Sequence, residues 1–302
     1  MSTGVALVAT PHLSQPWSVN PECFSDAALV VLGHGTTLND NSAAPVLQHA
    51  AELRRRKIFA DVREAFWKQE PQIKQVLAEI LAPRVFIVPM FISEGYFASE
   101  VIPRELGFVL ADDPASRVTH HAPRTAHYCK PVGTHESMTR VLLARAREIV
   151  ERHPFPRAPK TKDITLFIAG HGTERSDQSR KNIERQVELI RAADIYADVR
   201  AVFMEEDPHI KGCQATATTR HVVVVPFFIS DGLHVVEDIP VLLGEPERLI
   251  KERHATGQPT WRNPTEKHGK LTWYSPAVGS EPLMADVILE RAIEAAETKQ
   301  NL

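Results

Sequence analysis

The chain has 302 residues, of which 43% are hydrophobic and 24% charged, a composition that is ordinary for a globular protein of about two domains. Its 35 basic and 38 acidic side chains give a formal net charge of −3, which argues against a protein that binds nucleic acid or a membrane surface through a basic patch. There is no long apolar run, no basic signal-like N-terminus and no CxxC pair among the three cysteines, so we expect a cytoplasmic protein without a membrane segment.

Two series of alternating strands and helices are predicted after an N-terminal extension of residues 1–26. In the first series we expect strands at 27–32, 61–67, 84–91 and 126–132 and helices at 41–58, 70–82, 98–110 and 135–152. A segment rich in proline and charge, 153–163, is assigned to a linker. In the second series we expect strands at 164–169, 198–204, 221–228 and 271–278 and helices at 178–194, 207–217, 235–251 and 282–298.

The two series are copies of one another. ALVVLGHGT at 28–36 matches TLFIAGHGT at 165–173, an offset of 137 positions, and the same offset relates VFIVPMFIS at 85–93 to VVVVPFFIS at 222–230. YCKPVGT at 128–134 pairs with YSPAVGS at 274–280 at an offset of 146, so the second copy carries about nine additional residues around 252–269. A constant offset over such a distance indicates an internal duplication.

The fold class follows from this pattern. Strands that alternate with helices favour a parallel, doubly wound sheet. We therefore predict an α/β fold with two tandem domains related by internal duplication, the first spanning 27–152 and the second 164–302. The additional segment 252–269 is predicted to be a surface loop.

The candidate chemistry lies at the carboxyl ends of strands, where open α/β sheets bind their ligands. In the second copy His171 follows the first predicted strand, Glu205 the second and His234 the third. Two imidazoles and a carboxylate suit a divalent ion such as Co²⁺, Ni²⁺, Fe²⁺ or Zn²⁺, and a neutral imidazole can also accept a proton near neutral pH. These three residues are the candidate site.

The first copy does not keep this set of donors. At the same offset it has His34, Lys68 and Phe97, and neither a protonated lysine nor a phenylalanine ligates a metal. Taken singly, a histidine after a strand is more often a capping or core residue, and a carboxylate at a strand end is often only solvated. Neither GHGT motif continues as GxGxxG, because Leu38 and Arg175 stand at the sixth position, so no organic cofactor is expected.

These motifs resemble those of the CbiX/SirB sirohydrochlorin chelatases, which are class II chelatases, in their tandem-repeat form. The resemblance rests on GHGT, FMEEDP and PFFISDGLHVVEDIP after the three strands, and it covers about residues 27–150 and 164–298. It implies ATP-independent insertion of a divalent metal into a tetrapyrrole in cobalamin- or siroheme-type biosynthesis, with cobalt as first choice and iron or nickel as alternatives. It also implies that His171, His234 and Glu205 are the catalytic residues and the metal ligands, with the metal ion as a substrate.

The substrate and partners complete these expectations. A tetrapyrrole of this class carries many carboxylates, so cations are expected around it, and Arg175, Arg180 and Lys181 are the candidates, with His34 as a further contact. The competing interpretation of these three charges is a solvated helix face. A non-catalytic metal- or tetrapyrrole-binding homologue, such as a metallochaperone or regulator, is the alternative function. We expect no nucleic-acid or membrane partner and a monomer or homodimer.

Overall fold

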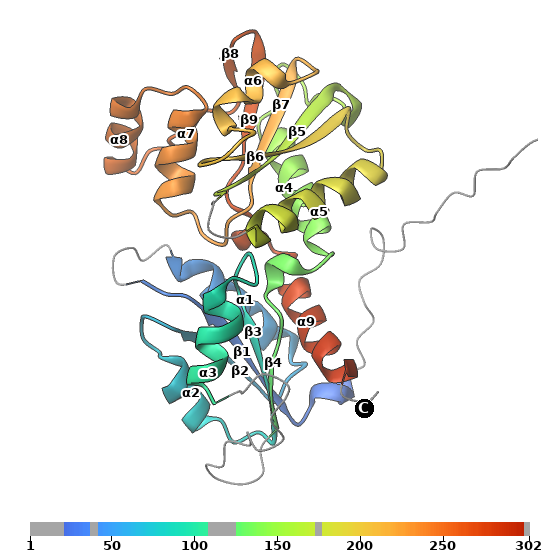
Figure 1. Ribbon diagram of the computed structural model, residues 1–302, viewed down its shortest axis with the longest axis vertical. Coiled ribbons are helices and arrows are strands. Elements are labelled where there is room, and N and C mark those ends of the chain that lie inside the picture. The colour runs from blue at the N-terminus through green and yellow to red at the C-terminus, as the bar shows by residue number, and fades with distance from the viewer. Residues whose placement is uncertain (1–20, 37–41, 108–124, 173–176, 299–302) are drawn as a thin grey trace, which may run out of the picture.

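The computed structural model describes residues 21–36, 42–107, 125–172 and 177–298. They form two lobes stacked along the long axis of the molecule, and each lobe is built on its own sheet (Figure 1). Among these residues no helix has the length and apolar character that a membrane span requires.

The first sheet has four parallel strands in the order β2-β1-β3-β4. The strands are β1 (Ala27–Gly33), β2 (Asp61–Phe66), β3 (Arg84–Pro89) and β4 (Thr125–Tyr128). The elements that precede and connect them are the short η1 (Pro21–Phe24), α1 (Ala44–Arg56), α2 (Ile73–Glu79), the π-helical turn η3 (Phe97–Val101) and α3 (Ile102–Glu105).

The second sheet repeats this arrangement in the order β6-β5-β7-β9 and adds an antiparallel edge strand, β8. Its strands are β5 (Ile164–Gly170), β6 (Asp198–Phe203), β7 (His221–Pro226), β8 (Thr265–Lys267) and β9 (Lys270–Tyr274). Its further elements are η5 (Thr161–Asp163), α5 (Gln178–Ala192), η6 (Ile210–Gly212), α6 (Cys213–Thr216), η7 (His234–Asp238), α7 (Ile239–Leu242) and α8 (Glu247–Ala255). The predicted α/β fold with two duplicated, parallel sheets is confirmed.

Two local predictions in the second copy are wrong. The helix expected over 235–251 is broken into η7, α7 and α8, since the chain turns at Gly244, whose φ is 101°, just before Pro246. The additional segment 252–269 is more than a surface loop. It contains the end of α8 and the strand β8, which pairs with β9 through a turn where His268 and Gly269 both have positive φ.

The central strands are buried from end to end because both faces of each sheet are covered. Every residue of β1 and of β5 is buried. Successive side chains point to opposite faces, so Leu29 of β1 joins a core shared by the two lobes, whereas Val30 packs with residues of α2 and α3. A strand buried on both faces reads as the continuous apolar run that the sequence shows.

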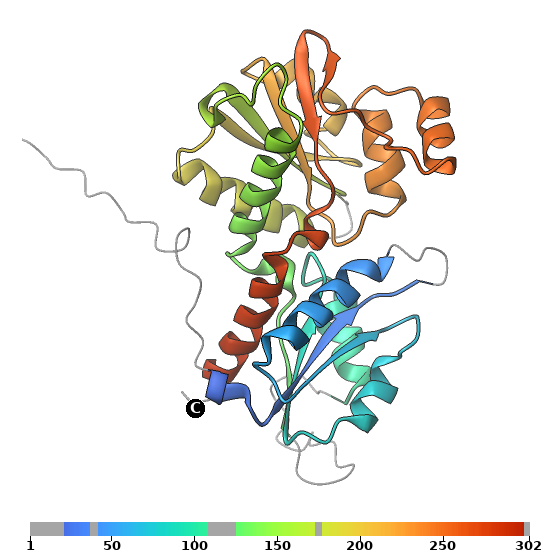
Figure 2. The same ribbon diagram turned by 180° about the vertical axis from the view of Figure 1, so that it is seen from behind.

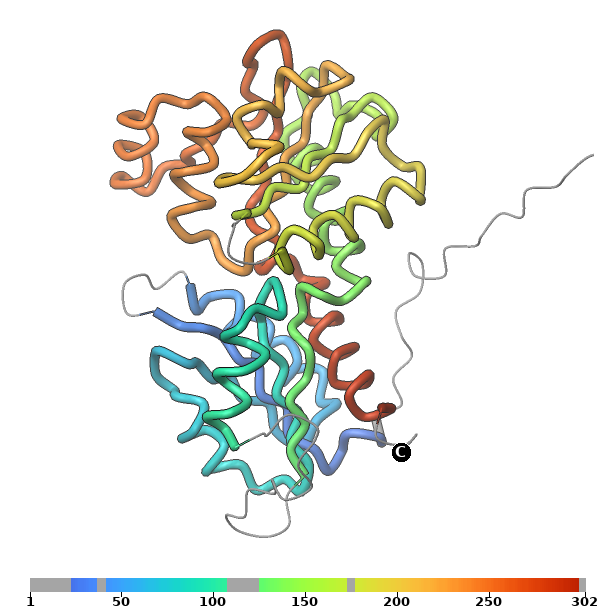
Figure 3. The backbone as a smooth tube through the Cα atoms, viewed as in Figure 1, coloured from blue at the N-terminus to red at the C-terminus, as the bar shows by residue number. Residues whose placement is uncertain are grey.

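The helices that follow the last strands are exchanged between the lobes. After η4 (Val132–Thr134), α4 (Met138–Arg152) packs against β7 and β9 of the second sheet. After η8 (Val278–Ser280), α9 (Met284–Thr298) packs against β3 and β4 of the first sheet and beside α1 (Figure 2). Figure 3 shows the chain rising into the upper lobe through α4 and returning to the lower lobe in α9. Each lobe therefore contains the last helix of the other sequence repeat, and the limits of 27–152 and 164–302 stay a prediction for the repeats.

Equivalent arginines secure the exchange. Arg145 of α4 donates a hydrogen bond to Oγ of Ser280, at 2.7 Å, and Arg291 of α9 donates one to Oγ1 of Thr134, at 2.5 Å. Each guanidinium also donates to a backbone carbonyl of the same loop, and both side chains are buried. Each helix is thus tied by a buried cation to the loop that precedes the other helix.

The same two loops pass very close to the chain that follows the third strand of each sheet. A Cβ atom on Gly279 would lie 1.8 Å from the carbonyl oxygen of Ile229, and one on Gly133 would lie 2.2 Å from that of Ile92. Only glycine fits at such a distance. The repeated VG dipeptide of the sequence therefore marks a backbone contact that both lobes share.

Candidate functional site

The GHG turn at the end of β5 sets the geometry of the site. Gly172 has a φ of 72°, in the left-handed region, and a Cβ atom there would lie 2.7 Å from Cγ of Glu206. The amide of Glu205 donates a hydrogen bond to the carbonyl of His171 at 3.1 Å, which ties the end of β6 to the end of β5. The turn thus places two of the predicted site residues next to each other.

The structure brings His171, Glu205 and His234 together. The imidazole ring centroids lie 4.9 Å apart with the rings 80° to one another, and Glu205 Oε2 is 3.6 Å from His171 Nδ1. β5 lies between β6 and β7, so the two histidines follow the adjacent strands between which the chain reverses its direction across the sheet. Ligands of open α/β sheets bind at this switch point.

Both histidines of the site have their Nδ1 atom occupied. His171 Nδ1 donates to the carbonyl oxygen of Gly172 at 2.7 Å, since a carbonyl can only accept. His234 Nδ1 donates to Oδ2 of Asp238, also at 2.7 Å. A neutral imidazole with its proton on Nδ1 keeps a lone pair on Nε2, the form that binds metal ions or accepts protons. Asp238 was missed in the sequence, where its spacing of four residues from His234 is the signal that could have found it.

The three residues form an open site. Their side chains are 36% (His171), 58% (Glu205) and 51% (His234) exposed. Within the described ranges no three His, Cys, Asp or Glu side chains are arranged to hold a metal ion. The geometry is that of a pair of nitrogen donors with a solvated carboxylate at its margin, and the assignment of all three as metal ligands stays a prediction.

The segment that carries His234 is held from two sides. The buried Tyr274 of β9 donates its hydroxyl to the carbonyl of Val235 in η7, at 2.7 Å. His254 of α8 hydrogen-bonds through Nδ1 to the carboxylate of Glu237, which is also in η7. The additional segment of the second copy therefore contacts the turn that carries a candidate catalytic residue.

The first copy keeps the same turn but surrounds its histidine with aromatic rings. His34 Nδ1 donates to the carbonyl of Gly35 at 2.8 Å, as His171 does in its own turn. The ring of Phe97, which stands where His234 stands in the second copy, lies 5.3 Å from the rings of both His34 and Trp67. Lys68, at the position of Glu205, is exposed. The first copy thus presents an aromatic group with a cation beside it in place of the donor pair.

The candidate cations for the substrate differ in their surroundings. Arg180 of α5 forms ion pairs with Glu206 at 2.6 Å and Glu184 at 3.0 Å, and its guanidinium lies 4.8 Å from the ring centre of Phe203. Those contacts hold it within the lobe. Lys181 is exposed, with Asp177 3.7 Å away. Arg175 lies outside the described residues. The substrate contacts of these cations and of His34 stay predictions.

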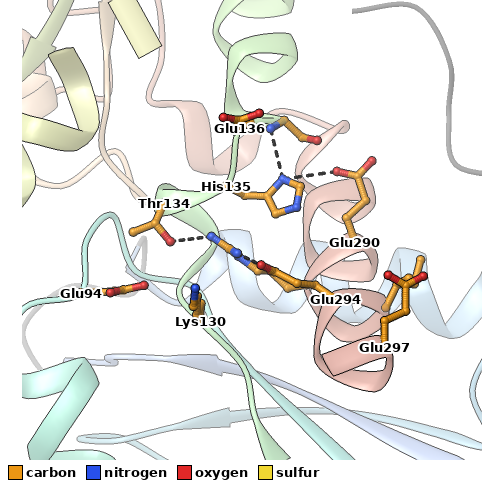
Figure 4. Close-up of a pocket in the computed structure, with 11 residues that line it drawn as sticks. Glu94, Lys130, Thr134, His135, Glu136, Glu290, Glu294 and Glu297 are labelled. Carbon is orange, nitrogen blue, oxygen red and sulfur yellow. Dashed lines mark hydrogen bonds and ion pairs between the residues drawn. The ribbon is translucent and has the colours of Figure 1, made fainter. Parts of the chain in front are cut away.

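A hollow of about 400 Å³ lies elsewhere, where α9 meets the start of α4 (Figure 4). Five of its eleven lining residues are glutamates, and none of the lining residues is a predicted site residue. His135 stands in its wall, with Nδ1 3.6 Å from Oε2 of the buried Glu290. The candidate site at the strand ends and this hollow are therefore separate features of the molecule.

Comparison with known proteins identifies the family. The sequence model of CbiX matches residues 28–149 and 165–295, which are the two copies. A probable sirohydrochlorin cobaltochelatase from Halobacterium salinarum is 43% identical over 279 residues, which cover 89% of this chain and 91% of that protein.

Two solved structures share the fold. The sirohydrochlorin chelatase SirB from Bacillus subtilis subspecies spizizenii, in complex with cobalt, has a TM-score of 0.59 at 16% identity. The match covers 91% of this chain and 97% of the SirB chain. A multi-domain protein from Deinococcus radiodurans with structural similarity to chelatases has a TM-score of 0.69 at 26% identity. The match covers 89% of this chain and 55% of the longer Deinococcus protein. The chain belongs to the CbiX/SirB family of sirohydrochlorin chelatases.

Proposed function

We propose that the second copy inserts a divalent metal ion into sirohydrochlorin, or a closely similar tetrapyrrole, without ATP, in cobalamin- or siroheme-type biosynthesis. The observation that carries this proposal is the His171–His234 pair at the switch point of the sheet. In each of these histidines the Nδ1–H group is engaged in a hydrogen bond within the protein. Co²⁺ is the proposed metal, because the Halobacterium relative is named a cobaltochelatase and the Bacillus protein was solved with cobalt. Fe²⁺ and Ni²⁺ are the alternatives, since imidazole and carboxylate ligands accept all three ions.

An open pair of nitrogen donors suits a metal that must leave. A site closed by four protein ligands retains its metal as a structural element, whereas open positions allow another ligand to bind the ion. At His171 and His234 the remaining positions are free for water and then for the pyrrole nitrogens of the macrocycle. The exposed side chains allow the ion to be loaded from solution.

Insertion also releases the protons of the pyrrole N–H groups. The carboxylate of Glu205, beside His171 and more than half exposed, can accept such a proton and pass it to water. An imidazole Nε2 that is not holding the ion can accept one as well. We assign proton removal to Glu205 and metal delivery to the histidine pair.

The first copy has no equivalent donor pair, and we assign it to substrate binding. Phe97 and Trp67 offer flat apolar surface to a macrocycle, and the exposed Lys68 offers a cation to its carboxylates. His34 is the remaining contact in this copy. Lys181 is the exposed cation assigned to the substrate in the second copy.

An absorbance assay with purified full-length chain, sirohydrochlorin and Co²⁺ tests the proposal. Metal insertion should be faster than without protein, and His171→Ala and His234→Ala should each lower the rate by about 10²-fold or more. His34→Ala should have a milder effect, and His153→Ala, at the C-terminal end of α4, serves as the matched control. Competition between Co²⁺, Fe²⁺ and Ni²⁺ then ranks the metals. Binding without any acceleration would instead indicate a metal- or tetrapyrrole-binding homologue, and a wild-type rate in His234→Ala would refute the site.

A further inference from the structure

We propose that Asp238 is a positioning residue for His234. It fixes the ring orientation and holds the imidazole proton on Nδ1, so that Nε2 is the atom presented to a metal ion. This inference rests on the metal-insertion function proposed above and adds a residue to it. It is carried by the geometry of one turn and by a comparison of the two copies.

The geometry is that of a carboxylate–imidazole pair within η7. Asp238 Oδ2 and His234 Nδ1 are 2.7 Å apart, a full hydrogen bond. The neighbouring carboxylate does not compete for the ring, because Glu237 is bonded to His254 of α8. A carboxylate bonded to the distal nitrogen of a ligating histidine sets its tautomer and makes the other nitrogen a better ligand.

The first copy lacks both the histidine and the aspartate. At the offset of 137 the two positions are Phe97 and Val101 in η3, whereas Glu100 beside Val101 and the Ile-Pro that follows are the same in both copies. Without an imidazole to orient, the carboxylate is absent too. This is the pattern expected if Asp238 serves His234.

The aspartate is not needed to build the turn. η3 and η7 are both five-residue π-helical turns, and each is anchored by a tyrosine at the equivalent place in the sheet. Tyr128 donates to the carbonyl of Ala98 at 2.8 Å, as Tyr274 does to that of Val235 at 2.7 Å. The segment folds in the same way with valine at the fifth position. Asp238 and His234 are, moreover, about half exposed, so their bond contributes little to the stability of the fold.

Nuclear magnetic resonance of the metal-free, full-length chain with ¹⁵N-labelled histidine reads the tautomer directly. At about pH 8.5, two units above the usual imidazole pKa, His234 should show its proton on Nδ1. In Asp238→Ala it should shift to the mixture rich in Nε2–H that a free imidazole adopts. The signal of His171, bonded to a backbone carbonyl, should stay unchanged as an internal control, and His234→Gln assigns the resonance.

Binding of Co²⁺ alone supplies the second measurement, followed by the absorption of the bound ion. Asp238→Ala should weaken binding by about 10–100-fold, and Asp238→Asn, whose amide oxygen can still accept from Nδ1, should recover part of the loss. Glu247→Gln, which removes an exposed carboxylate paired with Lys251 on α8, is the matched control and should bind as the wild type does.

The outcomes separate this inference from the proposed function. An unchanged His234 tautomer together with unchanged Co²⁺ affinity in Asp238→Ala would overturn the positioning role, whatever the wild-type insertion rate. A shifted tautomer and weakened Co²⁺ binding in a protein that inserts no metal would keep the positioning role and refute the chelatase activity. A melting temperature close to that of the wild type shows that the variant is folded.

Discussion

The stability of this protein should fall in mild acid because of one buried histidine. His135 stands at the start of α4, and its Nδ1 accepts a hydrogen bond from the amide of Ser137 at 3.1 Å, so the fold uses the neutral ring. Burial, with the nearby Arg291 charge as a smaller cause, lowers the pKa of His135 from 6.5 to about 4. The carboxylate of Glu290, 3.6 Å from Nδ1, does not reverse this, because it is ion-paired with the guanidinium of Arg140.

The magnitude and sign follow from proton linkage. Below about pH 6.5, His135 binds a proton in the unfolded chain but stays neutral in the folded chain. The free energy of unfolding therefore decreases as the pH falls, until the pH reaches the pKa of folded His135. At about 1.4 kcal/mol per pKa unit, the full loss is about 3 kcal/mol. Above about pH 7.5 the ring is neutral in both states and contributes no pH dependence.

Urea unfolding of the wild type and of His135→Gln between about pH 4.5 and 8 measures this loss. Glutamine can accept from the Ser137 amide but does not titrate, so the wild type should lose about 2–3 kcal/mol relative to the variant across this range. Their difference near pH 8 is the baseline. A difference that stays constant with pH would show that His135 is protonated equally in the folded and unfolded chain, and would refute the reasoning.

Three further changes test the exchange of helices between the lobes. Gly279→Ala puts a Cβ atom 1.8 Å from the carbonyl oxygen of Ile229 and should cost about 3 kcal/mol or prevent folding, whereas Gly212→Ala, where nothing lies within 4 Å, should be nearly neutral in thermal denaturation. Arg291→Met removes two hydrogen bonds of a buried guanidinium, to Oγ1 of Thr134 and to the carbonyl of Pro131, and should cost about 2–4 kcal/mol in urea unfolding. Burial raises the pKa of Glu281, so Glu281→Gln should raise the melting temperature at pH 7, and this gain should shrink as the pH falls through that pKa.

The strands, the duplication and the clustering of the three site residues could be predicted because each depends on a local pattern. A β-branched run predicts a buried strand wherever it pairs, and parallel strands place the residues that follow them at one edge. His171, Glu205 and His234 meet for this reason. The repeat supported the prediction of the site residues, since it allowed each position in one copy to be compared with its counterpart in the other.

The features that escaped prediction depend on contacts between distant segments. Helical periodicity identifies the apolar face of α4 but not which sheet covers it, and the two sheets present almost the same apolar surface. The role of Arg180 depends on Glu206 being within reach, which sequence spacing does not reveal. The break near Gly244 is different, because Gly244 and Pro246 are local signals of a helix end that the continuous apolar spacing around them outweighed.

The exchange of α4 and α9 also governs the order in which the molecule can be completed during synthesis. The strands of the lower lobe are the first to leave the ribosome, yet one of their covering helices, α9, lies at residues 284–298. Until that helix emerges, Phe86 and Val88 of β3 lack the helix that covers them and are open to water and to chaperones. For the same reason, each of two half-chains divided at the linker would lack the helix that covers its own sheet. Each half carries the helix that covers the other sheet, so two co-expressed halves should assemble with the architecture of the single chain.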